Sequence, residues 1–140
     1  MGYFYMDKRK INLAKFRFEK AEEELEISKT LFDKEYFGAS LSSSYYAIFH
    51  AVRTVFAFEE IDSKRHTGII YLFSEHFVKT GYLNNELRKI LSHAFEHRLD
   101  SDYVDFYIVE KATAEKQIDN AEYFIKEISN FVKSFYKIEL

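Results

Sequence analysis

The stretch TAEKQIDNAEYFIKEISNFVKSF, residues 113–135, decides the fold class. Its apolar residues recur at alternating spacings of four and three, which places them on one face of a helix that starts near Thr113. An unbroken seam of this kind is typical of a helix that packs almost antiparallel, at about 20°, against other helices of a bundle. The seam consists of Ala114, Ile118, Ala121, Ile125, Ile128, Val132 and Phe135.

A second seam lies near the start of the chain and predicts a first helix over roughly residues 10–34. Its members follow the same spacing, and the charged residues between them mostly occupy the opposite side of the helix. Gly38 is the expected stop, because glycine readily adopts the left-handed conformation at a helix C-terminus. This seam consists of Ala14, Phe18, Ala21, Leu25, Ser28 and Phe32.

Three further helices are expected between these two. Residues 39–58 are apolar almost all round, so this helix should lie in the middle of the bundle or be shared with a partner chain. A short helix is expected over residues 69–77, and a third main helix over about 86–99, with Asn84 or Asn85 as its N-cap. The stretch RLDSDYVDFYIVE, residues 98–110, breaks the helical pattern, so we expect a loop there, with a short strand as the alternative.

These patterns predict an all-α protein, an up-and-down antiparallel bundle of four main helices with a short helix between the second and the third. The absence of proline and the presence of only 4 glycines argue against a sheet-rich domain, which needs more turn residues. A length of 140 residues suits a single domain over residues 1–140, with a core over about 10–135.

The composition excludes several classes of protein. There are no cysteines, so disulfides and thiolate metal sites are excluded. A net charge of -3 does not suit a generally basic nucleic-acid binder, although a local basic patch is compatible with it. No apolar run approaches the roughly 20 residues that span a bilayer. We therefore expect a cytoplasmic protein without membrane association.

Two histidines on the predicted third helix match a metal-binding pattern. His93 and His97, with Glu96 between them, form H-x-x-E-H, in which two imidazoles bind zinc and a carboxylate activates water. Such a site needs a third ligand from another helix, and nothing in the sequence marks one. The prediction is therefore no metal and no cofactor, with both histidines on a partly exposed helix face.

Two other histidines are candidates for a binding site. His50 lies in the apolar helix with Tyr46 and Arg53 on the same face, at i-4 and i+3, so it either lines a pocket or is an ordinary core residue. His66 precedes a predicted helix start, where it either helps to hold an anion on free backbone amides or caps the helix.

Two arginines on the predicted third helix are candidates for binding phosphate. Arg98 and Asp102 lie four residues apart, and they form an ion pair if the helix continues. Arg88 and His93 are the alternative pair, but side chains five residues apart in a continuous helix point about 140° apart. The latter two would therefore converge less easily on one substrate.

Several segments together resemble the HEPN domain (higher eukaryotes and prokaryotes nucleotide-binding), in its small stand-alone prokaryotic branch. They are YYAIFHAVR, RHTGII, HFVKTGYL, HRLDSDY and AEYFIKEI, in this order, and the resemblance covers about residues 21–131. It implies a four-helix bundle, a two-fold homodimer and, in many members, a minimal nucleotidyltransferase partner in a toxin-antitoxin or defence pair. Active members of the family are metal-independent endoribonucleases with an R-x4-6-H motif contributed by both protomers. In some pairs the partner adenylylates a tyrosine beside that motif.

By its place in the chain, Arg98 matches the arginine of the family motif. The histidine expected about five residues later is absent, and Asp102 and Tyr103 stand there as R-x-x-x-D-Y. A carboxylate is a poor neutral-pH acid, so this change puts ribonuclease activity in doubt. Arg88 and His93 satisfy R-x4-H literally but lie earlier in the helix than the family motif.

The sequence therefore predicts a HEPN-type protein that binds nucleotide or RNA near Arg98, with a nucleotidyltransferase partner. The alternative is a non-catalytic, dimeric helical interaction module, which the missing histidine and the apolar second helix favour. If the protein is an enzyme, Arg98 and Asp102 are the expected catalytic residues. The expected nucleotide- or RNA-binding residues are Tyr103, His50, Tyr46 and His66.

Overall fold

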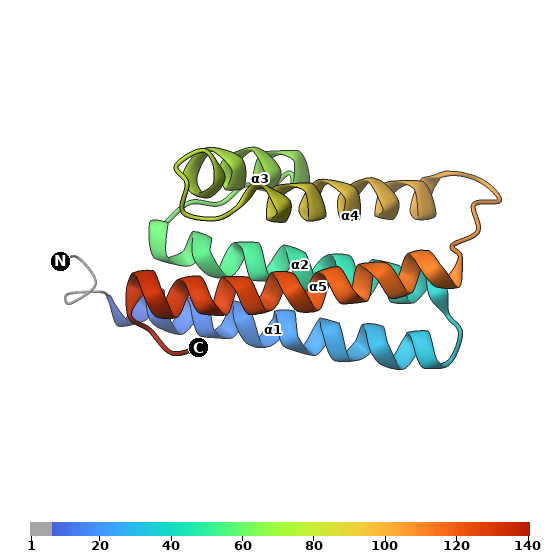
Figure 1. Cartoon of the computed structure of the whole chain (residues 1–140), viewed down its shortest axis with the longest axis horizontal. Coiled ribbons are helices and arrows are strands. Elements are labelled where there is room, and N and C mark those ends of the chain that lie inside the picture. Colours follow the sequence, from blue (N-terminus) through green and yellow to red (C-terminus); the bar gives the residue numbers. More distant parts are fainter. Residues whose placement is uncertain (1–6) are drawn as a thin grey trace.

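A computed structural model describes residues 7–140, and over this range every regular element is a helix. The elements are α1 (Lys8–Asp33), α2 (Phe37–Glu59), α3 (His66–Phe73), the π-helical turn η2 (Ser74–Val78), α4 (Asn85–Tyr103), α5 (Lys111–Phe131) and the π-helical turn η3 (Val132–Tyr136). Successive main helices run in opposite directions, with α3 and α4 above α2 and α5 and with α1 below (Figure 1). The predicted all-α bundle of four main helices plus a short one is confirmed.

Helix α2 lies at the centre of the bundle, as its apolar circumference predicted. It packs against α1, α4 and α5, and its buried residues lie on all sides. Small residues let α1 approach it closely: the Ser28 hydroxyl donates to the Ser40 carbonyl at 2.7 Å, and the Ser40 hydroxyl donates to the Ser28 carbonyl at 2.8 Å. These reciprocal bonds satisfy two buried hydroxyls where the two helices meet.

Local signals explain where α1 and α4 begin and where α1 ends. The Asp7 carboxylate accepts a hydrogen bond from the Arg9 backbone N–H at 2.8 Å, and the Asn84 side chain accepts from Glu86 N–H at 3.0 Å. Both bonds cap first-turn amides that have no acceptor within the helix. The prediction that Gly38 stops α1 is wrong: Glu35 takes the left-handed conformation with φ 65°, and Gly38 lies in the first turn of α2.

The seam of the last helix is confirmed except at its end. Residues from Ala114 to Val132 along the seam are buried, but Phe135 is 41% exposed and Tyr136 is buried in its place. The wider turn of η3 accounts for this change, because a π-helical turn carries more residues than an α-helical one and shifts the side chains that follow.

The predicted end of the third main helix is also wrong. Helix α4 continues past Leu99 to Tyr103, so Arg98 and Asp102 lie on a helix and not in a loop. Residues 104–110 form the loop, and the alternative of a short strand is wrong because no strand occurs within residues 7–140. None of the helices in the part of the chain described here is long and apolar enough to cross a bilayer.

Candidate functional site

Arg98 is the centre of the candidate site. Its side chain is only 18% exposed, and it points from α4 toward two tyrosines of α2. The guanidinium carbon lies 5.1 Å from the ring centroid of Tyr46 and 5.6 Å from that of Tyr45. At these distances the negative faces of both rings attract the cation. The arginine is thus held in a defined position by α2.

Within residues 7–140, Asp102 is the one carboxylate that forms an ion pair with this guanidinium. Arg98 Nε lies 3.4 Å from Asp102 Oδ2, the i,i+4 ion pair that the sequence predicted for a continuous helix. The geometry is not that of a hydrogen bond, and Nε is buried without a hydrogen-bond partner among the described residues. A buried, charged N–H without an acceptor costs free energy, on the order of 1–3 kcal/mol or more. Nε itself is inaccessible, so an oxyanion would bind the rest of the guanidinium, which belongs to a side chain that is 18% exposed.

His66, the first residue of α3, reaches into the same cluster. Its Nδ1 is hydrogen-bonded to the hydroxyl of Tyr45, and its ring stacks on Phe49 and Phe95 with centroids 4.9 and 5.7 Å away. Burial, and next the charge of Arg98, lower the pKa of His66, so its neutral form is favoured.

The pKa shifts of Tyr45 and His66 leave both groups uncharged at neutral pH. Burial raises the pKa of Tyr45 far above its usual value, so its hydroxyl stays protonated and can donate to Nδ1 of the neutral His66. When the Tyr45 hydroxyl is the donor, the remaining ring nitrogen, Nε2, carries the imidazole proton. His66 in this tautomer is a hydrogen-bond donor toward a ligand and not a proton acceptor.

His50 lies beside the cluster, with its ring centroid 6.3 Å from Tyr46 and 5.6 Å from Phe49. Burial lowers its pKa to about 4, and the charges of Arg53, Lys20 and Arg17 contribute. Its Nδ1 is buried without a hydrogen-bond partner among the described residues. His50 is therefore neutral at physiological pH.

A second group of charges borders the cluster on the side of α1. Arg53 forms an ion pair of 2.6 Å with Asp62, and Arg17 lies 3.4 Å from the same carboxylate. Arg17 also donates to the backbone carbonyl of Arg53 at 2.9 Å. Hydrogen bonds and the two arginine charges hold the pKa of Asp62 below its usual value despite its partial burial. This network fixes the connection between α2 and α3, and thereby the position of His66.

The structure brings together most of the residues that the sequence singled out. Helices α2, α3 and α4 each contribute to one cluster, here named the Arg98 cluster. Tyr103 lies outside it, 75% exposed at the end of α4. The Arg98 cluster consists of Tyr45, Tyr46, Phe49, His50, His66, Phe95, Arg98 and Asp102.

The alternative pair of Arg88 and His93 does not assemble a second site of this kind. Arg88 Nε bonds the side chain of Asn85 at 2.8 Å, within its own helix. His93 lines a separate pocket between α4 and α5, and no hydrogen bond joins it to Arg88. The structure thus places Arg98, and not Arg88, among aromatic side chains.

Three members of the Arg98 cluster were missed by sequence reasoning: Tyr45, Phe49 and Phe95. Phe49 had a usable signal, since it shares a helix face with Tyr46 at a spacing of three. Tyr45 had no such signal in the sequence, because α2 is apolar almost all round and no face of it is distinguished by its residue types.

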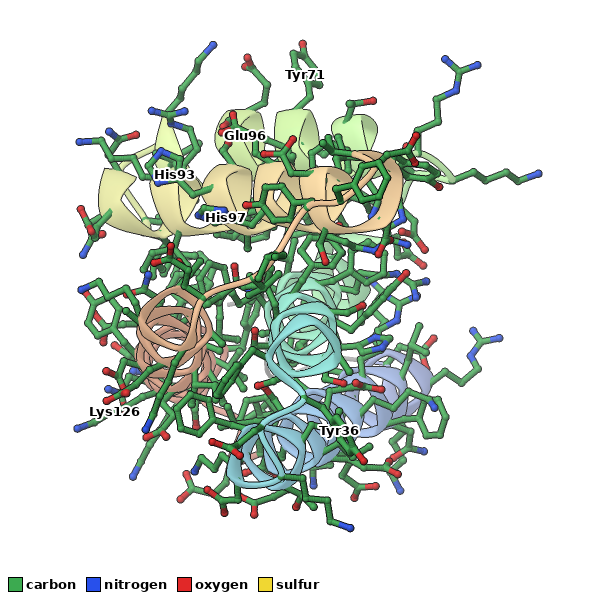
Figure 2. All side chains as sticks on the ribbon, turned by 90° about the vertical axis from the view of Figure 1, so that its right-hand side faces the viewer. Tyr36, Tyr71, His93, Glu96, His97 and Lys126 are labelled. Carbon is green, nitrogen blue, oxygen red and sulfur yellow. The ribbon has the colours of Figure 1, made fainter. Side chains whose placement is uncertain are left out.

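The H-x-x-E-H pattern does not form a zinc site within residues 7–140. No group of three histidine, aspartate or glutamate side chains in this range could hold a metal ion. His93 and His97 line the pocket between α4 and α5, whereas Glu96 does not. Figure 2 shows Glu96 on the far side of α4 from α5, away from His97.

Fold and cluster together define a helical bundle that holds an arginine between aromatic rings. A sequence model of the HEPN domain matches residues 14–131, and the chain therefore belongs to the HEPN domain family. The resemblance noted from the sequence is confirmed.

Curated relatives extend this result. The chain is 30% identical over 116 residues to "Putative toxin MJ0142" of Methanocaldococcus jannaschii, covering 83% of this chain and 79% of that one. It is 31% identical over 114 residues to a "UPF0332 protein" of Thermotoga maritima, covering 81% and 86%. A protein of the same name from Archaeoglobus fulgidus is 35% identical over 116 residues, covering 83% and 92%.

Proposed function

We propose that this HEPN protein is a toxin-like protein that binds the phosphate group of RNA or a nucleotide at the Arg98 cluster. The observation that carries the proposal is the buried, incompletely paired guanidinium of Arg98. Two relatives from Methanocaldococcus jannaschii are named "Putative toxin MJ0142" and "Putative toxin MJ0605", and these names support its toxin-like character.

The chemistry of the cluster suits an oxyanion. Arg98 supplies a fixed cation with several N–H donors, and His66 Nε2–H supplies a neutral donor whose direction Tyr45 sets. Tyr46 offers a ring against which a base can stack. Asp102 orients Arg98 through their ion pair. Each of these groups binds or positions a ligand, and none requires a metal.

The same geometry supports binding more strongly than cleavage. A ribonuclease needs a base that removes the proton from a 2′-hydroxyl. His66 with its pKa lowered is a weak base, and so is His50, whose pKa is lowered to about 4. Metal-independent endoribonuclease activity is therefore the second part of the proposal, and it requires groups from another protomer or a change of tautomer.

The test compares two arginines of α4. RNA binding and cleavage are measured with and without chelator for the wild type, Arg98→Gln and Arg88→Gln. We expect Arg98→Gln to weaken RNA binding at least tenfold, and Arg88→Gln to leave it unchanged. Cleavage that resists the chelator and is lost only in Arg98→Gln supports the ribonuclease. Loss only in Arg88→Gln contradicts the assignment of Arg98.

We further propose a homodimer and a small nucleotidyltransferase partner, as the family resemblance implies. Tyr103 is 75% exposed, so its hydroxyl is accessible to a modifying enzyme. Co-expression with the neighbouring gene product, followed by intact-mass measurement of the wild type and Tyr103→Phe, tests this. A mass increase of one adenylyl group that Tyr103→Phe abolishes supports the partner, and an unchanged mass contradicts it.

The alternative function is a non-catalytic interaction module, and one observation favours it. The loop after α4 exposes Val104, Phe106 and Ile108, with Phe106 fully exposed at 100%. Exposed apolar side chains grouped in one short loop are typical of protein interfaces. This reading predicts no RNA binding and a change of oligomeric state in Phe106→Glu, measured by light scattering after size-exclusion chromatography.

A further inference from the structure

A pocket lies between α4 and α5, and none of its lining residues belongs to the Arg98 cluster. Its volume is about 380 Å³, at the small end of the range of ligand pockets. His93 and His97 line it from α4, and Figure 2 shows His97 on the side of that helix that faces α5. The side chains that α5 contributes are Thr113, Lys116, Gln117 and Asn120.

The lining of this pocket favours an anion. It contains two imidazoles, an ammonium group, two amides and a hydroxyl, but no aspartate or glutamate. This is unusual in a chain with 23 acidic and 20 basic residues. Lys116 forms no ion pair with any of the described residues, so its charge is not neutralised by the protein. A concave surface with an unpaired cation and several hydrogen-bond donors attracts oxyanions.

The start of α5 adds further donors to the same pocket. Ala112 and Thr113 belong to the first turn of this 21-residue helix and line the pocket. First-turn N–H groups have no acceptor within their helix, and the N-cap residue Glu110 makes no side-chain hydrogen bond to them. The partial positive charge at this helix end acts in the same direction as Lys116.

Gln117 gives the pocket a rigid, polar wall. The residue is only 4% exposed, and its Nε2 donates to the Leu41 carbonyl at 2.8 Å and to the Ser44 hydroxyl at 2.6 Å. These bonds tie the wall to α2, and they orient the amide because the Leu41 carbonyl can only accept. Gln117 Oε1 is buried without a hydrogen-bond partner among the described residues. The Gln117 amide therefore anchors α5 to α2 beside the pocket.

We propose that the pocket between α4 and α5 binds the phosphate group of a small molecule. Lys116 and the first turn of α5 hold the oxyanion, and His93, His97 and Asn120 donate hydrogen bonds to it. The remaining volume accommodates a group about as large as a ring, against the apolar wall that Ile90 and Ala94 form. The site goes beyond the proposed function because it involves none of the residues of the Arg98 cluster.

The test uses two probes, inorganic phosphate and adenosine monophosphate. Isothermal titration calorimetry measures their dissociation constants at constant ionic strength, set with sodium chloride. The variants are Lys116→Ala, Arg98→Gln and, as the matched control, Lys126→Ala, which removes another exposed lysine of α5 outside this pocket (Figure 2). We expect Lys116→Ala to weaken binding at this pocket at least tenfold, whereas Lys126→Ala binds like the wild type. Arg98→Gln removes only the binding that the Arg98 cluster contributes and leaves the binding that depends on Lys116.

The remaining outcomes separate this proposal from the preceding one. Binding lost in Arg98→Gln but retained in Lys116→Ala overturns the new site and supports the Arg98 cluster instead. Equal weakening in Lys116→Ala and Lys126→Ala shows a general charge effect and also overturns it, as does the absence of binding of either probe at millimolar concentration. Tighter binding of adenosine monophosphate than of phosphate identifies a nucleotide-sized ligand, and equal affinity identifies the free anion.

A second readout locates the probe directly. Histidine ring C–H signals in the proton NMR spectrum are assigned by comparison with His93→Gln and His97→Gln. We expect the signals of His93 and His97 to shift on addition of phosphate, also in the Arg98→Gln variant, in which the Arg98 cluster has lost its cation. Shifts confined to His66 contradict the pocket between α4 and α5. Asn120→Leu, which replaces a donor with an apolar side chain of similar size, should weaken binding without lowering the melting temperature.

Discussion

Replacing His50 with glutamine should reduce the acid sensitivity of this fold. The pKa of His50 is lowered to about 4 in the folded protein, chiefly by burial, against a usual value of about 6.5 in the unfolded chain. As the pH falls below about 6.5, the unfolded chain binds a proton at this position that the folded protein does not bind. Stability is therefore lost from about pH 6.5 downward, and the loss levels off below about pH 4.

The magnitude follows from the two pKa values. Between pH 7.5 and pH 5 the shift corresponds to at most about 2 kcal/mol of unfolding free energy. His50 is only partly buried, so screening by solvent reduces the expected value to about 1 kcal/mol. The other histidines and the carboxylates contribute equally to the wild type and to His50→Gln, and their contributions cancel in the difference.

Urea unfolding at both pH values measures this difference. We expect the wild type to lose about 1 kcal/mol more than His50→Gln between pH 7.5 and pH 5. His76→Gln, which removes an exposed imidazole and leaves His50 in place, is the matched control and should show the wild-type loss. Equal losses in the wild type and His50→Gln would refute the reasoning, because they would show that His50 is solvated in the folded protein.

Three further substitutions test contacts described above, each by urea unfolding. Tyr45→Phe removes the hydroxyl that bonds His66 and should lower the free energy of unfolding by about 1–2 kcal/mol. Ser40→Ala breaks the reciprocal bonds with Ser28 between α1 and α2 and should cost about 1–2 kcal/mol. Phe106→Gly relieves a left-handed residue with φ 62° whose side chain is fully exposed, so it should raise stability by up to about 1 kcal/mol.

Each of these substitutions has a control in the same chain. Tyr36→Phe and Ser134→Ala remove hydroxyls from exposed residues and should change the free energy of unfolding by less than about 0.5 kcal/mol. Ile108→Gly changes a residue of the same loop that is exposed but does not have a positive φ, and it should not be stabilising. If Phe106→Gly and Ile108→Gly have the same effect, the left-handed conformation does not matter to stability.

Periodicity in the sequence was sufficient to predict the fold, because the seams of α1 and α5 repeat without a break and bury one face. It failed where tertiary contacts set the geometry. The last turn of α4 carries no apolar repeat, yet Arg98 there packs on two rings of α2, and the helix continues to Tyr103. The predicted burial of Phe135 was wrong because no pattern in the sequence predicts a π-helical turn.

The candidate site, too, could be predicted from the sequence only in part. Charged or polar residues within or next to predicted helices were sufficient to propose four members of the site, and the structure brings them together: Arg98, Tyr46, His50 and His66. Their charge states and the pairing of His66 with Tyr45 depend on burial, which no local pattern reveals. The pocket between α4 and α5 was hidden for another reason: its cation, Lys116, comes from a helix far from the two histidines in the chain.

The central position of α2 also predicts the order in which the helices pack during folding. Only residues 34–36 separate α1 from α2, so the two helices can meet after closing a very short loop. The seam of α5, which begins only at Lys111, must reach α2 across the whole of α3 and α4, and closing that longer loop costs more entropy. The hairpin of α1 and α2 is therefore the natural first unit to form. The pocket at α5 is completed only when the segment from Lys111 onward docks.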